Sequence, residues 1–423
     1  MQASRAWVVI QRGGSAIEEF GVDAEGLRWA LDQLIEWRGA PGTPVPRPVP
    51  LDLPDTLPED GVGDHAALEQ LVGPALRSAV RLDHPGYFAH MDPPTPWMTW
   101  AAAAWAASVN QNLLHPDAAP AARELEQRTI AWLCPFFGMS GGHLVPGSSV
   151  ANLTALWAAR EVAGVREVVA SEAAHVSVVK AANLLGLPLR SVPTDDRQRM
   201  RSDALGDLDH AALVLTAGTV STGAVDPLDG GVGAAWRHVD AAWAGPLRFS
   251  GRYAHRLAGI ERADSVSVSG HKWLYQPKES GIVLFADVNR AHAALNFGGS
   301  YLAAPNIGVL GSHGASAIGL AATLLAWGSR GVATRVEGDM ALADRLCTLV
   351  EEDDRLELWN HHITGVVNWR PRQGDARTVR DRLANAWVSL ATIDGGVWLR
   401  SVAANPHADP ELVVSQILDA CER

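Results

Sequence analysis

A lysine follows directly on a predicted buried strand near the middle of the chain. The run Ser265–Ser269 (SVSVS) is rich in valine, and it leads through Gly270 and His271 to Lys272. A lysine at the end of a buried strand is shielded from water, and burial lowers the pKa of its ammonium group. An amine without its proton is a nucleophile that condenses with carbonyl groups. The pattern predicts covalent chemistry at Lys272, although a lone lysine in such a loop is more often a solvated surface residue.

An acid stands at the end of another predicted strand. Asp240 closes the run Arg237–Asp240 and is followed by small apolar residues. A carboxylate among apolar neighbours needs a cationic partner, and a protonated pyridine nitrogen would serve. The stretch from Asp240 to Lys272 has about the length of one strand–helix–strand unit. We therefore expect both side chains at one edge of a sheet, where ligands bind in α/β proteins.

Two further patterns suit the same ligand. In Leu144–Asn152 (LVPGSSVAN), a Pro-Gly turn precedes Ser148 and Ser149, which we expect to cap the following helix. The free N–H groups of a helix N-terminus can hold a phosphate, although most such caps bind nothing. His175, at a strand-to-helix junction, is by itself most often a capping or core residue, and it also offers a flat ring for stacking. A phosphate cradle, an acid for a ring nitrogen, a stacking ring and an imine-forming lysine together match pyridoxal 5′-phosphate.

The order of these motifs resembles that of the pyridoxal-phosphate-dependent group II amino-acid decarboxylases, which have the aspartate-aminotransferase fold (fold type I). The resemblance rests on LVPGSSVAN, SEAAHVS, LTAGTVSTGAVDP, HVDAAWAG and SGHKW. It covers residues 80–330 well and the C-terminal region loosely. It implies decarboxylation of a small L-amino acid to its amine, through a Lys272 aldimine and a quinonoid. It also implies a homodimer with shared active sites.

The resemblance assigns roles to individual residues. Lys272 would hold the cofactor and later carry a proton, Asp240 would pair with the pyridinium nitrogen, and His175 would stack on the ring. The implied cofactor contacts are Ser148, Ser149, His175, Thr219, Asp240, Ala242, Ser269, His271, Lys272 and, from a neighbouring subunit, Ser312. The implied substrate contacts are Tyr87, Phe88, His90 and Arg400, of which Arg400 is the candidate for the substrate carboxylate.

The segment after the lysine departs from the family pattern. Decarboxylases of this kind usually carry a long mobile loop with a protonating tyrosine, whereas this chain passes quickly from Tyr301 to Gly311. Other reactions of the same cofactor therefore stay open: transamination, β-elimination, or decarboxylation with oxidative deamination to an aldehyde. A non-catalytic relative that binds the cofactor is a further alternative, which the intact Asp240, His175 and Lys272 disfavour. A NAD-dependent dehydrogenase would need a glycine fingerprint that is missing here.

The elements that must position these residues alternate between strand and helix. Apolar periodicity predicts strands at 167–170, 189–192, 212–216, 237–240, 265–269 and 281–285, and helices at 123–134, 150–162, 175–185, 315–331 and 336–352. This alternation predicts an α/β fold whose mostly parallel sheet is sandwiched by helices. The link 226–236 is short and rich in glycine, so we expect the covering helix there to be reduced.

Three regions are predicted along the chain. Residues 1–80 form an N-terminal arm with helices at 27–37 and 66–80, joined by a proline-rich stretch that cannot be helical. The arm either wraps a neighbouring subunit or caps its own domain. Residues 81–330 form the large cofactor-binding domain. Residues 331–423 form a small α+β domain with strands at 363–369 and 396–401 and helices at 376–386 and 410–421.

Composition limits the remaining function classes. The 423 residues are 47% hydrophobic and 19% charged, which is typical of a globular chain, and the net charge of −12 argues against broad nucleic-acid binding. The longest low-charge run, 97–109, is too short to span a bilayer, and no signal-peptide core is present, so we expect a cytoplasmic protein without a membrane partner. Cys134, Cys347 and Cys421 lack metal-ligand spacing, so we expect reduced thiols and no metal. Among 16 tryptophans, Trp243 and Trp273 flank the cofactor motifs, and we expect them to line the cofactor cavity.

Overall fold

The computed structural model describes residues 21–47, 51 and 53–422. They divide into two compact units, one ending at Val80 and one beginning at Arg81. The first unit contains α1 (Ala24–Gly39), α2 (Asp64–Val72) and the π-helical turn η2 (Gly73–Arg77). The Asp23 carboxylate caps α1 by accepting hydrogen bonds from two backbone N–H groups of its first turn. Neither α1 nor α2 has a buried residue.

A seven-stranded sheet forms the centre of the second unit, with the order β1-β7-β6-β5-β4-β2-β3. Its strands are β1 (Gly141–Val145), β2 (Glu167–Ser171), β3 (Leu189–Val192), β4 (Ala211–Thr216), β5 (Trp236–Asp240), β6 (Ser265–Ser269) and β7 (Gly281–Phe285). All neighbours from β3 to β6 pair in parallel, whereas β7 pairs antiparallel with both β6 and β1. The mostly parallel sheet is confirmed. Strand β1 was not predicted, because its sequence GGHLV has little β propensity of its own.

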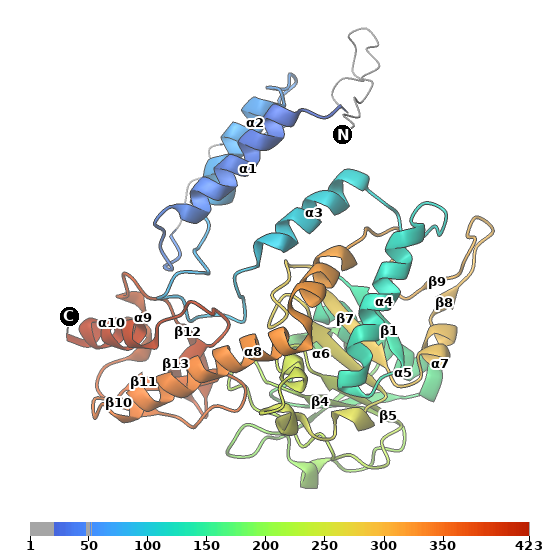
Figure 1. The fold of residues 1–423 in the computed structure, drawn as a ribbon. Helices are drawn as coiled ribbons and strands as arrows, with labels where there is room; N and C mark the ends of the chain where they lie inside the picture. Colours follow the sequence, from blue (N-terminus) through green and yellow to red (C-terminus); the bar gives the residue numbers. More distant parts are fainter. Residues whose placement is uncertain (1–20, 48–50, 52, 423) are drawn as a thin grey trace. The chain divides into compact units, whose positions relative to one another are not determined.

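Helices cover both faces of this sheet (Figure 1). One face packs against α5 (Ser148–Ala163), α6 (Val176–Leu184) and α7 (Val288–Ala294). The other packs against α4 (Pro120–Phe137) and the first part of α8 (Ala317–Glu351), and α3 (Trp97–Val109) lies against α8. In β4, Val214 joins the first core and Leu213 the second, as the two-residue period of a strand requires.

The connections around β5 differ from the expected strand–helix–strand unit. Residues 217–235 contain turns, bends and the isolated Ala217–Val225 bridge but no helix, which confirms that the covering helix after β4 is reduced. Between β5 and β6 the chain forms three 3₁₀ segments, η4 (Gly245–Phe249), η5 (Ala254–Leu257) and η6 (Ile260–Arg262), in place of the expected α-helix. Glycine interrupts the helix: Gly259 has φ 98°, and a Cβ there would lie 2.7 Å from the backbone nitrogen of Asp229.

Helix α8 leads from the large sheet to a small one (Figure 1). It consists of two helical segments separated by a kink at Gly328, whose backbone is not helical (φ 60°, ψ 179°). Two helices were expected here, and the break between them lies at Gly328 instead of at residues 332–335. The small antiparallel sheet has the order β10-β11-β13-β12, formed by β10 (Leu356–Leu358), β11 (Val366–Pro371), β12 (Ser389–Ile393) and β13 (Gly396–Val402). The second part of α8, α9 (Ala376–Asp381) and α10 (Pro410–Glu422) pack against it. The predicted boundary at 330/331 falls inside α8.

A short hairpin of β8 (Asn296–Phe297) and β9 (Asn306–Ile307) follows α7. Tyr301 lies between its two strands with a relative exposure of 74%. No helix in the described part of the chain is both long and apolar enough to cross a bilayer. The same residues contain no cluster of three or more side chains suited to a metal ion.

Candidate active site

Lys272 lies in a tight turn at the carboxyl end of β6. The Tyr275 N–H donates to the Lys272 carbonyl over 2.8 Å, and the Gln276 N–H donates to the Gly270 carbonyl over 3.0 Å. A Cβ at Gly270 would lie 2.1 Å from Ser280 Oγ, so the turn needs glycine there. Burial is the main cause that lowers the pKa of Lys272, and the Asp240 carboxylate acts in the opposite direction. Lys272 as a whole residue is half-buried, so the expected shielding of this amine is partial.

Asp240 ends the adjacent strand β5, opposite Ser267 of β6. Its side chain is 4% exposed. One carboxylate oxygen accepts from the Asn152 amide over 2.8 Å, and the other accepts from the Ala242 N–H over 3.1 Å and from the Ser267 hydroxyl over 3.4 Å. These donors are neutral, so the carboxylate is held in position and keeps its charge available for a cation.

Asn152 links Asp240 to the two strands and to α6. Its carbonyl oxygen accepts from Ser267 Oγ over 2.6 Å and from His238 Nε2 over 3.0 Å. Its amide also donates to Ser177 Oγ over 2.9 Å. Sequence reasoning quoted Asn152 in the GSSVAN motif but did not select it. A buried asparagine in the second turn of a helix at the phosphate motif was the available signal.

His238 extends the same network with an assigned tautomer. Because the Asn152 oxygen can only accept, His238 Nε2 carries the hydrogen, and Nδ1 therefore accepts from Ser265 Oγ at 2.9 Å. The Ser265 hydroxyl in turn accepts from the Trp236 indole N–H at 2.9 Å. Burial lowers the pKa of His238 to about 4, so the ring is neutral at neutral pH. Sequence reasoning missed His238 because it lies inside β5 and not at the strand end.

His175 is the N-cap residue of α6. Its Nδ1 lies 2.7 Å from Ser177 Oγ and accepts from the Ser177 N–H, so the ring is tied to Asn152 through Ser177. Burial is the largest cause that lowers the pKa of His175, while Asp240 raises it and Lys272 lowers it. These charge effects indicate that His175, Asp240 and Lys272 lie near one another, and their roles toward a cofactor stay predictions.

The phosphate end of the expected cradle is formed mainly by glycines and by Ser269. Gly147 (φ 92°) is the N-cap of α5, and neither serine that follows it makes a cap bond, so the expected Ser-Ser cap is corrected. A Cβ at Gly281 would lie 2.3 Å from the Gly147 backbone, which brings β7 against this helix start. Ser269 is fully buried at the end of β6, and its hydroxyl has no partner among the described residues. A buried hydroxyl without a partner fits a site that an oxygen-rich group completes.

His271 borders the same cradle. Its Nδ1 donates to the Ser280 carbonyl over 3.1 Å, and its Cε1 would lie 3.8 Å from a Cβ at Gly147. Burial lowers the pKa of His271 to about 4. Ser148 and Ser149 begin α5, where the first backbone N–H groups of a helix have no partner within the helix and could donate to a phosphate.

Thr219 and Ala242 lie in the loops that follow β4 and β5. The Thr219 hydroxyl is 2.9 Å from Thr222 Oγ1 and accepts from the Ala224 N–H over 3.0 Å, so it closes its own turn. Ala242 is 6% exposed, and its N–H holds the Asp240 carboxylate. Ala242 therefore fits the position beside a ring, whereas the Thr219 hydroxyl is already engaged within its loop.

Arg400 extends from β13 of the small sheet toward this site. Its Nε donates to the Val220 carbonyl over 2.6 Å, and its Nη1 donates to Ser389 Oγ over 2.9 Å. Burial lowers its pKa to about 10, with opposing effects of Asp92 and Tyr87. Arg400 in turn contributes to lowering the pKa of Lys272, so the two cations lie close enough to interact.

The other predicted substrate contacts divide into two groups. Tyr87 is buried beside Asp92 and Arg400, and burial raises the pKa of its hydroxyl. His90 is more exposed, and burial together with Arg400 lowers its pKa. Phe88 is 0% exposed within the core of the small sheet, which corrects its assignment from a substrate contact to a core residue.

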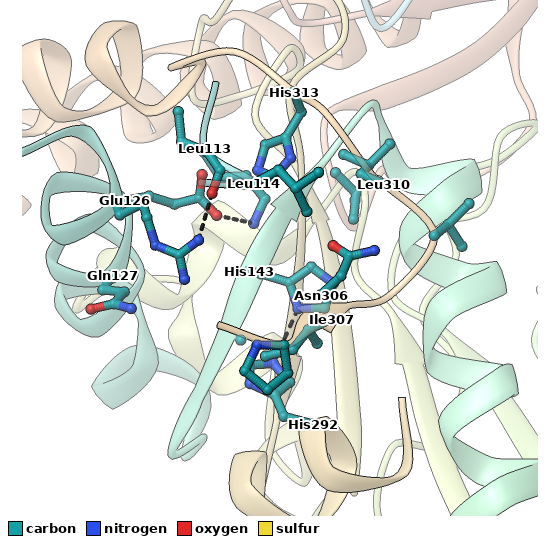
Figure 2. Close-up of a pocket in the computed structure, with 16 residues that line it drawn as sticks. Leu113, Leu114, Glu126, Gln127, His143, His292, Asn306, Ile307, Leu310 and His313 are labelled. Carbon is teal, nitrogen blue, oxygen red and sulfur yellow. Dashed lines mark hydrogen bonds between the residues drawn. The ribbon is translucent and has the colours of Figure 1, made fainter. Parts of the chain in front are cut away.

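Ser312 lies beside a different pocket, of about 150 Å³, between α4, β1 and residues 305–313 (Figure 2). Its hydroxyl accepts from the Asn112 amide over 3.0 Å, and none of its described hydrogen bonds is to another predicted cofactor contact. In the pocket, His143 Nδ1 lies 3.1 Å from His292 Nε2, and burial lowers the pKa of His143 to about 3. Glu126 Oε2 is buried without a hydrogen-bond partner among the described residues, and burial raises the Glu126 pKa.

Trp243 and Trp273 do not line a cavity. Both are fully buried, and their ring centroids are 4.1 Å apart. Their indole N–H groups donate to the Thr364 and Ala403 carbonyls over 2.7 and 2.8 Å. A buried indole N–H needs a hydrogen-bond partner, and both of these partners lie next to strands of the small sheet. The tryptophan pair therefore connects the cofactor motifs to the small sheet.

Comparison with known proteins places this arrangement among enzymes. The model of the pyridoxal-dependent decarboxylase conserved domain matches residues 66–372. The chain is 31% identical to L-2,4-diaminobutyrate decarboxylase of Rhizobium meliloti (strain 1021), over 98% of this chain and 88% of that protein. It is 29% identical to aspartate 1-decarboxylase of Aliivibrio fischeri (strain ATCC 700601 / ES114), over 55% of this chain and 53% of that protein. A crystal structure of Oryza sativa TDC with PLP and tryptamine has a TM-score of 0.83 at 23% identity, covering 95% of this chain and 99% of that one.

Proposed function

The chain belongs to the pyridoxal-dependent decarboxylase family, and we propose that it releases CO₂ from a small L-amino acid with Lys272 as the residue that attaches the cofactor. The observation that carries this proposal is the turn after β6, which places the shielded Lys272 amine beside Asp240 and the unpartnered Ser269 hydroxyl. Pyridoxal 5′-phosphate, the family's cofactor, supplies an electron sink that accepts the electrons of the broken Cα–carboxylate bond.

The residues of this chain would hold that cofactor at three places. Asp240, fixed by Asn152 and Ala242, offers its carboxylate to a protonated ring nitrogen. His175, neutral and oriented by Ser177, offers a flat ring for stacking. The start of α5 and the Ser269 hydroxyl offer donors to a phosphate.

Lys272 and Arg400 would have different roles toward the substrate, namely proton transfer and carboxylate binding. A Lys272 ammonium group with a lowered pKa gives up its proton more readily than an ordinary lysine, so it can return a proton to the carbon that loses CO₂. Arg400 uses Nε and Nη1 to bind the protein, so Nη2 is its remaining nitrogen for a substrate carboxylate. Asp92 and Tyr87 surround the same guanidinium group and would limit the size of the substrate side chain.

The exposed Tyr301 favours a second outcome. No other tyrosine lies in the segment between α7 and α8, and Tyr301 stands at a hairpin tip with 74% exposure. If neither Lys272 nor a tyrosine returns the proton, dioxygen can intercept the electrons. The substrate, O₂ and water would then give an aldehyde, CO₂, ammonia and hydrogen peroxide.

A product-identified screen tests both outcomes. Purified protein with added pyridoxal phosphate is given each common amino acid, including acidic, basic and diamino ones, and CO₂, amine, aldehyde and peroxide are measured. We expect CO₂ with an equal amount of amine, and loss of both CO₂ and the bound-cofactor absorbance in Lys272→Ala. Lys180→Ala, on the exposed surface of α6, is the matched control. Cofactor absorbance that persists in Lys272→Ala would refute the role of Lys272.

We further propose a homodimer in which Ser312 of one copy completes the phosphate site of the other. In support, α1 exposes Leu27, Leu31 and Ile35 at spacings of one helical turn, and Ser312 lies in an exposed segment apart from its own chain's cradle. Light scattering should give twice 45.0 kDa. The double variant Leu31→Asp, Ile35→Asp should have a measured mass closer to that of the monomer. A wild-type protein that has the mass of a monomer would refute the proposal.

A further inference from the structure

The turn that carries Lys272 contains a residue in an unfavourable backbone conformation. Tyr275 has φ 57°, in the left-handed region that side chains other than glycine rarely adopt. Such a conformation is unfavourable for a residue with a side chain and persists only where the surroundings hold it. The backbone N–H of Tyr275 donates to the Lys272 carbonyl over 2.8 Å, so this conformation closes the lysine turn.

The Tyr275 side chain is held by an acid from another element. Its ring is 3% exposed, and its hydroxyl donates to Oδ2 of Asp339, which is 0% exposed on α8. The ring meets Trp327 edge-on, with centroids 5.8 Å apart and an angle of 81°. Burial raises the pKa of Asp339 to about 8, so the acid keeps its proton at neutral pH and the pair stays buried without a net charge.

Helix α8 holds the turn on both sides of its bend. Before Gly328, Thr323 Oγ1 accepts from the Gln276 amide over 3.0 Å, and after Gly328, Asp339 accepts from Tyr275. Beyond Asp339, the same helix enters the core of the small sheet. The Asp339–Tyr275 bond therefore connects the lysine turn to the part of α8 that packs with the small domain.

We propose that Asp339 is a positioning residue for Lys272: by holding the Tyr275 hydroxyl, it keeps the turn closed and the Lys272 amine shielded beside Asp240. The inference rests on the proposed function of Lys272. No described hydrogen bond joins Asp339 to the cofactor cradle or to the substrate contacts. Its neighbours in the lysine turn are Tyr275 and the indole of Trp273, the residue after Lys272, so it acts through this turn and not on the cofactor directly.

Labelling of Lys272 in the cofactor-free full chain tests this directly. Lys180, Lys272 and Lys278 are the lysines of the sequence, so peptide mass spectrometry follows each one separately, and the exposed Lys180 is an internal reference. The rate of acetylation is measured against pH in wild type, Tyr275→Phe, Asp339→Leu and Asp339→Asn. Glu337→Gln is the control, because Glu337 lies on the same helix but binds Ser250 Oγ at 2.5 Å.

A loosened turn admits water, so the labelling midpoint of Lys272 should rise by about one pH unit toward its ordinary pKa in Tyr275→Phe and Asp339→Leu. Asp339→Asn, which can still accept from the tyrosine, should fall between these variants and the wild type. In the cofactor-loaded protein, the first two variants should bind pyridoxal phosphate about tenfold more weakly.

Two outcomes would overturn the proposal. One is a folded Tyr275→Phe variant, with wild-type thermal unfolding, whose Lys272 midpoint is unchanged. The other is a shift of equal size in Glu337→Gln. Tyr275→Phe removes a single oxygen and fills the same space. The labelling midpoint of Lys272 can therefore still be measured in this variant if Asp339→Leu does not fold. Because labelling needs no cofactor, a protein that fails to bind pyridoxal phosphate would refute the proposed function without deciding this inference.

Discussion

The side-chain amide of Asn152 donates to the Asp240 carboxylate over 2.8 Å while its carbonyl oxygen accepts from Ser267 and His238. A single asparagine on α5 thus fixes the orientation of the carboxylate at the end of β5. Asn152 and Asp240 are 0% and 4% exposed, so water cannot replace either partner.

Replacing Asn152 should therefore affect both stability and cofactor binding. Asn152→Leu keeps the branched shape but replaces the polar atoms with larger methyl groups. It leaves Asp240, Ser177, Ser267 and His238 each short of one bond, and it should destabilise the fold by about 2–4 kcal/mol. Urea unfolding measures this loss, and absorbance titration measures the weaker cofactor binding. Asn183→Leu, on the exposed side of α6, should change stability by less than about 0.5 kcal/mol. Equal losses of unfolding free energy in Asn152→Leu and Asn183→Leu would show that the Asn152 hydrogen bonds do not stabilise the fold.

The Arg400 guanidinium group has two roles, one in the fold and one in substrate binding. Substitutions at Arg400 and at its partner Ser389 can distinguish them. Arg400→Lys keeps a cation but loses the fork, so KM for the substrate should rise about tenfold or more. Ser389→Ala removes only the hydroxyl that accepts from Nη1, so it should cost stability with little change in KM. Steady-state kinetics and thermal unfolding of both variants check this. If KM is unchanged in Arg400→Lys, Arg400 serves the fold alone.

Stability should fall in acid because buried histidines must gain a proton. The folded-state pKa of His238 is about 4, below the ordinary 6.5, so its neutral form stabilises the fold above pH 6.5. This contribution is lost as the pH falls from 6.5 to 4, and it amounts to about 3 kcal/mol. Unfolding free energies across this range should show a flatter acid limb in His238→Gln. The exposed His255→Gln serves as the control, and an identical acid limb in His238→Gln would disprove the assignment.

Glu126 should show the opposite pH dependence. Burial raises its folded-state pKa above 4.5, so the unfolded chain ionises first. Stability from this group is therefore complete below pH 4.5 and declines as the pH rises toward the folded-state pKa. Glu126→Gln should remove this decline and stabilise the protein by up to about 1 kcal/mol at neutral pH. A lower unfolding free energy for Glu126→Gln than for the wild type at neutral pH would contradict this prediction. It would show that the carboxylate of Glu126 (Figure 2), whose Oε2 has no partner among the described residues, stabilises the purified protein.

Hydrophobic periodicity was sufficient for most of the large sheet. Strands such as β4 and β7 are apolar or β-branched over their whole length, because both of their faces are buried between layers of helices. Strand β1 escaped prediction because its glycines are required by contact: a Cβ at Gly142 would lie 1.9 Å from the Val283 carbonyl oxygen of β7. The α-helix expected between β5 and β6 failed because glycine and proline interrupt it.

The local sequence alone indicated where Asp240, Lys272 and His175 lie. Asp240 ends a strand, Lys272 lies in the turn just after one, His175 caps a helix, and strand ends on one sheet edge converge. The tertiary structure decided how these groups are held. Asn152, Ser267 and His238 come from three elements, and Asp339 reaches the lysine turn from 64 residues away. It also placed Phe88 and Trp273 in the core, because the side on which a large apolar ring packs depends on the neighbouring element and not on the ring's own sequence.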